Sequence, residues 1–255
     1  MKKIISIIIT ISIISCGVSS SYYQVLKTQV ENGKLENNLV VFEDINCIVT
    51  YDLWKDGGNV GFNVFNKTDK ILRIDLTKTF FVLNGVSYQY FQNRTFSNST
   101  NSGTINTYNI PRYFPYTNAE RVSSSISSTF STTFIEKSEV SIPPNSSSNI
   151  SEYKILDSRY VNCDLSKSPS LKEIKTLKFT KDISPYIFRN YITYYTSNDT
   201  VERENKFYVS EITNYPYDYM FEEIDTTFCG SKLDLPIDIL KKGAANAFFI
   251  KYDVY

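Results

Sequence analysis

Short runs of strand-forming residues, separated by tight-turn signals, are the feature that most limits what this chain can fold into. In residues 60–64 apolar side chains alternate with Gly and Asn, a period of two that indicates a strand with one buried face. Residues 79–83 and 86–91 flank Asn84-Gly85, which is the strongest short-range signal of a β-hairpin. We therefore predict a mostly β chain of antiparallel strands.

The composition supports this class. Aromatic residues make up 15% of the chain, with 20 Tyr and 17 Phe, and aromatic and β-branched residues favour strands. Two short helices are also predicted, over 22–30 and 234–242, from apolar spacing and from Pro and Gly near the ends of the second. The predicted strands are 39–42, 45–54, 60–64, 71–76, 79–83, 86–91, 150–156, 174–179, 191–196, 207–212 and 247–254.

These patterns divide the chain into two β-rich parts. Residues 38–157 are predicted to form an immunoglobulin-like antiparallel β-sandwich, because short strands and tight turns follow one another closely. Within it, residues 92–134 are rich in Ser, Thr and Asn and are predicted to be a long mobile excursion. Residues 158–255 are predicted to be a second β-rich unit, which either forms its own sandwich or completes the first.

The N-terminus has the pattern of a secretory signal. Lys2 and Lys3 precede an apolar run, mostly Ile, over residues 4–14, and Ser15-Cys16 closes it with small residues. That run is about half the roughly 20 residues that span a bilayer. We predict a signal peptide over 1–15 and a tether over 16–37.

Cys16 stands at the first position after the predicted cleavage. The segment 13–16 resembles the lipobox of bacterial lipoproteins, which implies that the Cys16 thiol carries diacylglycerol (and commonly palmitate on its amine). Two or more acyl chains give stable membrane anchoring. Gly17 is not the Asp of an inner-membrane retention signal, and residues 17–21 lack an acidic cluster. A cell-envelope location is expected, on the outer membrane and facing the periplasm.

Three cysteines remain after Cys16. Export makes a disulfide possible, and Cys163 and Cys229 are the predicted pair because both lie in loop-like sequence. Cys47 lies in an apolar run and is predicted to be a free, buried thiol.

Several segments carry a resemblance to a known family. They are Tyr51-Asp52-Leu53-Trp54, Gly57-Gly58-Asn59-Val60-Gly61-Phe62, Asn66-Lys67-Thr68-Asp69-Lys70 and Asn84-Gly85. Over about residues 22–91 the chain resembles uncharacterised lipoproteins of Bacteroidetes type. The resemblance implies an immunoglobulin-like sandwich and supplies no catalytic residues.

The residue counts exclude several kinds of chemistry. The chain contains no His, which removes Ser-His-Asp and Cys-His nucleophiles and histidine-based metal sites. Without Lys2 and Lys3, 25 basic residues face 27 acidic ones, so no basic excess attracts nucleic acid. No cofactor, metal site or nucleic-acid partner is predicted.

Paired carboxylates are the remaining catalytic option, as in glycosidases. The candidate groups are Glu43 with Asp44, and Glu222 with Glu223 and Asp225. Solvated surface acids are the preferred interpretation, because adjacent residues of a strand point to opposite faces.

Aromatic residues give a candidate binding site. Tyr215, Tyr217 and Tyr219 alternate around Pro216, and exposed Tyr makes an amphipathic platform for a sugar or a protein. The alternative, which we prefer, is that the rings cover the edge of the core. Thr200 and Thr226 each follow Asp and resemble O-glycosylation acceptors of the same bacterial group.

The leading hypothesis from the sequence is a membrane-anchored lipoprotein that binds or scaffolds an envelope protein or glycan without catalysis. A carbohydrate-binding lipoprotein using the loop tyrosines and a carboxylate-dependent hydrolase are the alternatives.

Overall fold

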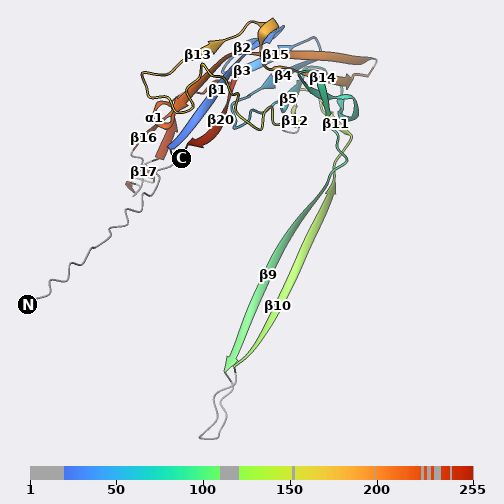
Figure 1. The fold of residues 1–255 in the computed structure, drawn as a ribbon. Helices are drawn as coiled ribbons and strands as arrows, with labels where there is room; N and C mark the ends of the chain where they lie inside the picture. The colour runs from blue at the N-terminus through green and yellow to red at the C-terminus, as the bar shows by residue number, and fades with distance from the viewer. Residues whose placement is uncertain are drawn as a thin grey trace, which may run out of the picture.

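The computed structural model describes residues 20–109, 121–150, 153–197, 199–224, 227–228, 231–232, 237–241 and 243–254. The fold is mostly β. Its antiparallel sheets form a curled half-barrel and a second sheet, so the predicted β-sandwich class is confirmed. Figure 1 shows the two layers, with one long hairpin extending away from them.

The larger sheet has nine strands. Its main order is β11-β6-β14-β15-β1-β20, while β7 pairs with β14 and β8, and β13 pairs with β15. The strands are β1 (Ser20–Glu31), β6 (Leu72–Asp75), β7 (Phe80–Leu83), β8 (Val86–Gln89), β11 (Glu139–Ile142), β13 (Thr176–Lys178), β14 (Ile187–Tyr195), β15 (Thr200–Pro216) and β20 (Ala247–Val254).

The second sheet has five strands in the order β12-β5-β4-β3-β2. They are β2 (Lys34–Glu36), β3 (Leu39–Glu43), β4 (Cys47–Tyr51), β5 (Phe62–Asn66) and β12 (Ser147–Ile150). The helical elements of the described residues are the 3-10 turns η1 (Leu76–Lys78) and η2 (Lys181–Ile183) and the one-turn helix α1 (Tyr217–Met220). Among the residues described, no helix is long and apolar enough to cross a membrane.

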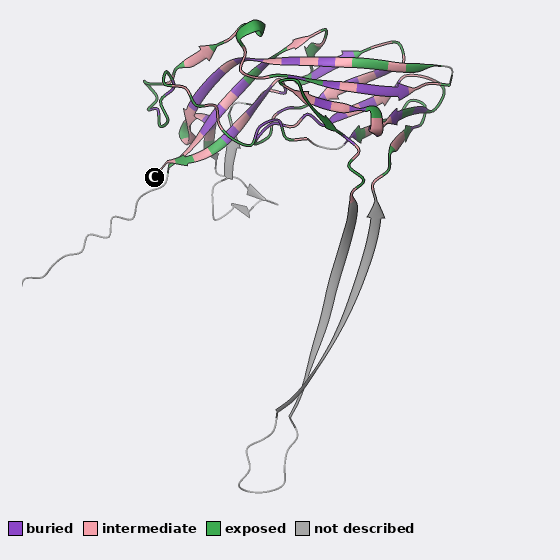
Figure 2. Ribbon diagram, turned by 45° about the vertical axis from the view of Figure 1, so that its right-hand side comes forward, coloured by how far each residue is buried: buried purple, intermediate pink, exposed green. Residues whose placement is uncertain are grey.

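The core lies between the two sheets. Buried and more exposed residues alternate along the strands, as Figure 2 shows, because successive side chains of a strand point to opposite faces. Phe207 of β15 stacks on Phe188 of β14, with ring centroids 4.9 Å apart and planes 6° from parallel. Phe42 and Tyr51 of the second sheet pack edge-on against Phe207. This aromatic cluster joins the layers.

The predicted Asn84-Gly85 hairpin is confirmed. β7 and β8 pair from Phe80 opposite Gln89 to Leu83 opposite Val86. Asn84 and Gly85 have φ of 47° and 86°. Positive φ at both central residues is the requirement of the hairpin turn that follows the twist of the strands, and Asn and Gly adopt it most readily.

The helix predicted over 22–30 is wrong, and the segment is not a free tether. It forms β1, which pairs with β15 on one side and β20 on the other. Gln24, Leu26 and Thr28 are buried in alternation. The spacing of four residues that suggested a helix places residues on one face of a strand equally well, since four is a multiple of two.

The division into units 38–157 and 158–255 also differs from the structure. β14 pairs with β6 and β7 of the first predicted unit, and β11 joins the same sheet through β6. The C-terminal strands therefore complete the first sandwich. Without β14, the strands β6 and β7 would lose a pairing partner. Unpaired strand edges leave backbone donors and acceptors unused.

A strand replaces the helix predicted over 234–242. Ile237–Leu240 forms β19, which pairs with β16 (Phe221–Ile224), while residues 233–236 and 242 lie outside the described residues. The partner strand supplies hydrogen bonds that so short a helix would lack. A further small pair joins β17 (Thr227–Phe228) to β18 (Ser231–Lys232).

The excursion predicted over 92–134 is an extended hairpin in its described part. β9 (Thr95–Asn109) and β10 (Arg121–Ile135) pair along their whole length, and they project from the sandwich in Figure 1. At its base, Glu136 accepts hydrogen bonds from the backbone of Gln92 and Arg94 at 3.0 Å and forms an ion pair with Arg94. Cross-strand hydrogen bonds satisfy the backbone without an apolar core.

Candidate functional site

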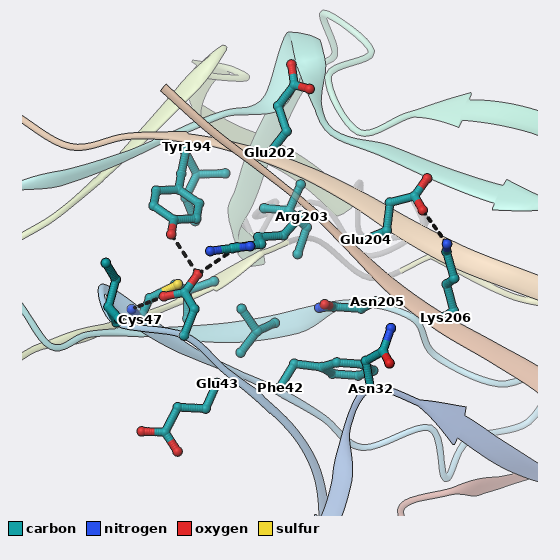
Figure 3. Close-up of a pocket in the computed structure, with 16 residues that line it drawn as sticks. Asn32, Phe42, Glu43, Cys47, Tyr194, Glu202, Arg203, Glu204, Asn205 and Lys206 are labelled. Carbon is teal, nitrogen blue, oxygen red and sulfur yellow. Dashed lines mark hydrogen bonds and ion pairs between the residues drawn. The ribbon is translucent and has the colours of Figure 1, made fainter. Parts of the chain in front are cut away.

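A cleft of about 650 Å³ opens between the two sheets, and we call it the end cleft. Its walls come from β3, β4 and β5 of the second sheet and from β6, β14 and β15 of the large sheet. It lies where β14 turns into β15 and where β1 ends, since Glu31 pairs with Lys206 there. Figure 3 shows the side chains that line it.

Strand alternation decides which side chains of β15 enter the end cleft. Arg203 and Asn205 are in phase with Phe207, which lies in the core. Glu202 and Glu204 belong to the opposite face: Glu202 accepts a hydrogen bond from Tyr191, and Glu204 pairs with Lys206 at 2.6 Å. Figure 3 shows their carboxylates directed away from Asn205. The interior of the end cleft therefore holds fewer carboxylates than the sequence of residues 202–206 suggests.

Asp44 is the centre of the polar groups in the end cleft. One of its oxygens accepts the backbone N–H of Asn46 at 2.7 Å and of Cys47 at 2.8 Å. The other accepts the hydroxyl of Tyr194 at 2.7 Å and Nε–H of Arg203 at 3.1 Å. A carboxylate has about four acceptor positions, so that of Asp44 is saturated.

These contacts determine the protonation states of Asp44, Cys47 and Tyr194. Burial of Asp44 raises its pKa, but the hydrogen bonds from Tyr194, the two backbone amides and Arg203 outweigh burial, and the pKa falls below its usual value. Burial raises the pKa of the Cys47 thiol to about 12, and burial also raises the pKa of Tyr194. At neutral pH Asp44 is ionised, whereas Cys47 and Tyr194 are protonated.

A buried polar network underlies the end cleft. The amide of Asn190 donates to the backbone oxygen of Val60 at 2.8 Å and to the hydroxyl of Tyr51 at 3.3 Å, and its oxygen accepts from Tyr90 at 3.0 Å. Asn205 donates to the same Tyr51 hydroxyl at 2.7 Å. These bonds hold β14 and β15 in fixed register against the second sheet.

A second, smaller groove of about 350 Å³ lies on the outer face of the large sheet, and we call it the aromatic groove. Trp54 and Tyr215 are among its lining residues. Of the three predicted contact tyrosines, Tyr215 therefore reaches a groove. Tyr219 stacks on Tyr215 at 4.6 Å, and Tyr217 stacks on Phe221 at 4.9 Å. The stacking of Tyr217 on Phe221 agrees with the preferred interpretation of these tyrosines, that their rings cover apolar surface.

The predicted cysteine and threonine sites have separate outcomes. Cys47 is buried with a free thiol, as predicted. Cys163 is exposed and carries a free thiol in the structure, so the predicted pairing with Cys229 is absent there, and Cys229 itself lies outside the described residues. Thr200 is exposed at the start of β15. Cys16 and Thr226 lie outside the described residues.

The candidate acid pairs are not brought together as pairs. Glu43 binds Lys67 at 2.7 Å, whereas Asp44 binds Tyr194 and Arg203, so the two carboxylates have different partners. Glu222 is exposed, and the side chain of Glu223 and all of Asp225 lie outside what the structure describes. Over the described ranges, no three His, Cys, Asp or Glu side chains are grouped to hold a metal ion.

Arg203, Asn205 and Tyr194 were not predicted as site residues. One signal was available: Arg203 and Asn205 are in phase with Phe207 and Val209, so two polar residues interrupt the apolar face of a strand. Their partners are distant in the chain and could not be found from spacing.

No family model, curated protein or solved structure matches this chain.

Proposed function

We propose that this protein is a non-enzymatic binding module of the cell envelope, anchored through lipid on Cys16, and that its ligand enters the end cleft. The observation that carries the proposal is the direction of β1. Ser20 follows Cys16 by four residues, and β1 then runs 12 residues toward the end cleft. At about 3.4 Å per residue, this separates the opening from the anchored end by roughly 40 Å.

The chemistry of the end cleft favours binding over catalysis. Asp44 is saturated by four donors, and the Cys47 thiol is protonated at neutral pH. A general base needs a free lone pair, and a thiol nucleophile must be deprotonated. Neither group meets its requirement, while the volume lies in the range of roughly 300–1,000 Å³ that ligand pockets occupy.

The proposed setting follows the sequence. A lipid on Cys16 would hold the sandwich at the outer membrane on its periplasmic side, with an envelope protein or glycan as the partner. The partner would approach from the side facing away from the bilayer, where the end cleft opens.

Replacement of Cys16 by Ala tests the anchor. Cells that express the full chain and are fed a labelled fatty acid are expected to label the wild-type protein and to leave the C16A variant unlabelled, because no other residue would carry diacylglycerol. Cys163→Ala is the matched control, since that thiol is exposed in the loop between β12 and β13; its label should remain. Label on C16A, or none on the wild type, would refute the anchor.

A second candidate function is carbohydrate binding at the aromatic groove, which Trp54 and Tyr215 favour because aromatic faces stack on sugar rings. On a glycan array, Tyr215→Ala is expected to weaken binding by roughly tenfold, in line with the loss of one aromatic contact. Tyr252→Ala, a stacked tyrosine on β20 outside the groove, is the control. Equal binding by wild type and Tyr215→Ala would rule out this site.

A further inference from the structure

The hydrogen-bond inventory of the end cleft restricts what can bind there. Asp44 has all four acceptor positions occupied. The hydroxyl of Tyr194 donates to Asp44 and accepts from Asn46 at 3.2 Å. These groups bind each other and have little left to offer a ligand.

Arg203 retains capacity to donate. Its Nε–H bonds Asp44, and about half of its side chain (51%) is exposed. A guanidinium has five N–H donors in a planar fork that matches a carboxylate. Because Asp44 holds the guanidinium at one edge, Arg203 is oriented in the absence of ligand and loses little freedom when an anion binds.

Asn205 provides a hydrogen-bond acceptor beside the donors of Arg203. It lines the end cleft and is only 4% exposed. Its amide nitrogen donates to Tyr51, while its amide oxygen accepts no hydrogen bond from any described residue. A buried polar atom without a partner costs about 1–3 kcal/mol. A ligand that donates to this oxygen would recover that cost.

Part of the remaining lining is apolar and comes from both sheets, while Asn32, Glu43, Glu202, Glu204 and Lys206 are polar or charged. Phe42, Val49 and Val64 contribute from the second sheet, and Ile74 and Ile192 from the large sheet. Ile192, which is 2% exposed, is the cross-strand neighbour of Arg203, so a buried apolar side chain lies beside it on the same face. The ligand must therefore combine an anion, a donor and an apolar group.

We propose that the end cleft captures the C-terminus of a peptide that ends in an apolar residue, with the carboxylate on Arg203, a backbone N–H on the Asn205 oxygen and the side chain on the apolar lining. Arg203 and Asn205 are two residues apart on one strand face, about 7 Å along β15. A peptide end carries its carboxylate and nearest N–H groups within that span. An alkyl carboxylate would leave the Asn205 oxygen without a donor. This inference rests on the proposed function, since it names the ligand class of the same cleft.

The test uses the full chain in lipid nanodiscs and N-acetylated tripeptides that end in Ile, Leu, Val or Phe. Titration calorimetry should detect binding of at least one free acid. Its C-terminal amide should bind at least tenfold more weakly, since it lacks the charge. N-methylation of the last amide should also weaken binding about tenfold, because the donor to Asn205 is lost while the protein is unchanged. A tripeptide ending in Asp should bind more weakly than the apolar set.

Arg203→Gln is expected to weaken binding of the free-acid tripeptide tenfold or more and to leave the affinity for the C-terminal amide unchanged. Arg189→Gln is the matched control: Arg189 lies on the adjacent strand, pairs with Glu204 on the outward face and lines no part of the cleft. Thermal unfolding of both variants checks that they fold. Equal affinity for acid and amide, no effect of N-methylation, or tighter binding of dodecanoate would overturn the inference.

Binding by none of the acids would also overturn it, and a separate measurement would then decide the proposed function. Crosslinking in intact cells, from a photoreactive residue placed at the cleft rim in position 45, should capture an envelope component if the cleft binds a different ligand. A crosslinked product without peptide binding would refute the peptide ligand but support the proposed binding function. If neither peptide binding nor a crosslinked product is found, the proposed binding function is refuted as well.

Discussion

Replacement of Phe207 by Ala should lower the free energy of unfolding by about 4 kcal/mol, the cost typical of removing a buried aromatic ring. Phe207 is 1% exposed. Its ring stacks on Phe188 and meets the edges of Phe42 and Tyr51 at 5.5 and 5.2 Å, so it contacts both sheets. A cavity here would be lined by rings that cannot all move inward.

Equilibrium denaturation in urea measures this effect. Phe80→Ala is the control, because Phe80 is only partly buried on β7 and its ring lies 6.5 Å from Tyr191; its cost should stay below about 2 kcal/mol, since less apolar area is uncovered. A loss under about 1 kcal/mol for Phe207→Ala would mean that the two sheets are not packed through this cluster.

Asp44→Asn should lower the free energy of unfolding by about 3 kcal/mol at neutral pH. The amide would keep one acceptor oxygen, yet its nitrogen would face donors that now bond the carboxylate. It would also leave Arg203 without its ion-pair partner. Removing one partner of a fully buried ion pair costs about 3–5 kcal/mol. The 51% exposure of the Arg203 side chain lowers that cost toward the bottom of the range.

The pH dependence gives the same prediction an independent readout. The pKa of Asp44 is lower in the folded chain than its usual value, because its hydrogen bonds outweigh burial. Its stabilising contribution is thus fully present above the unfolded pKa of about 3.9, and it is lost as the pH falls through the lower folded pKa. The wild type should lose stability below about pH 4, and Asp44→Asn should lose less over the same interval.

Unfolding in urea at several pH values between about 2 and 7 tests both parts. Asp69→Asn is the control, since Asp69 is exposed in the turn between β5 and β6, and it should change stability by less than about 0.5 kcal/mol. A variant at Asp44 that matches the wild type at neutral pH and in its acid slope would show that the four hydrogen bonds contribute no net stability.

The sequence by itself determined the class of fold and many of its strands. Alternation over 60–64, the Asn84-Gly85 turn and the run 247–254 are local signals, and the structure has β5, the β7–β8 hairpin and β20 there. The absence of His is likewise a property of composition that needs no structure. Each of these depends on residues close in the chain.

Only the tertiary structure decided which strands are neighbours. The spacing of Tyr22, Leu26 and Val30 suits a helix and one face of a strand, and pairing with β15 and β20 selects the strand. Asp44, Tyr194 and Arg203 meet although about 150 residues separate the first from the others. Periodicity assigns a side chain to a face, but it carries no information on what lies opposite that face. The end cleft is made of such opposite faces, so it became visible only when the two sheets packed together.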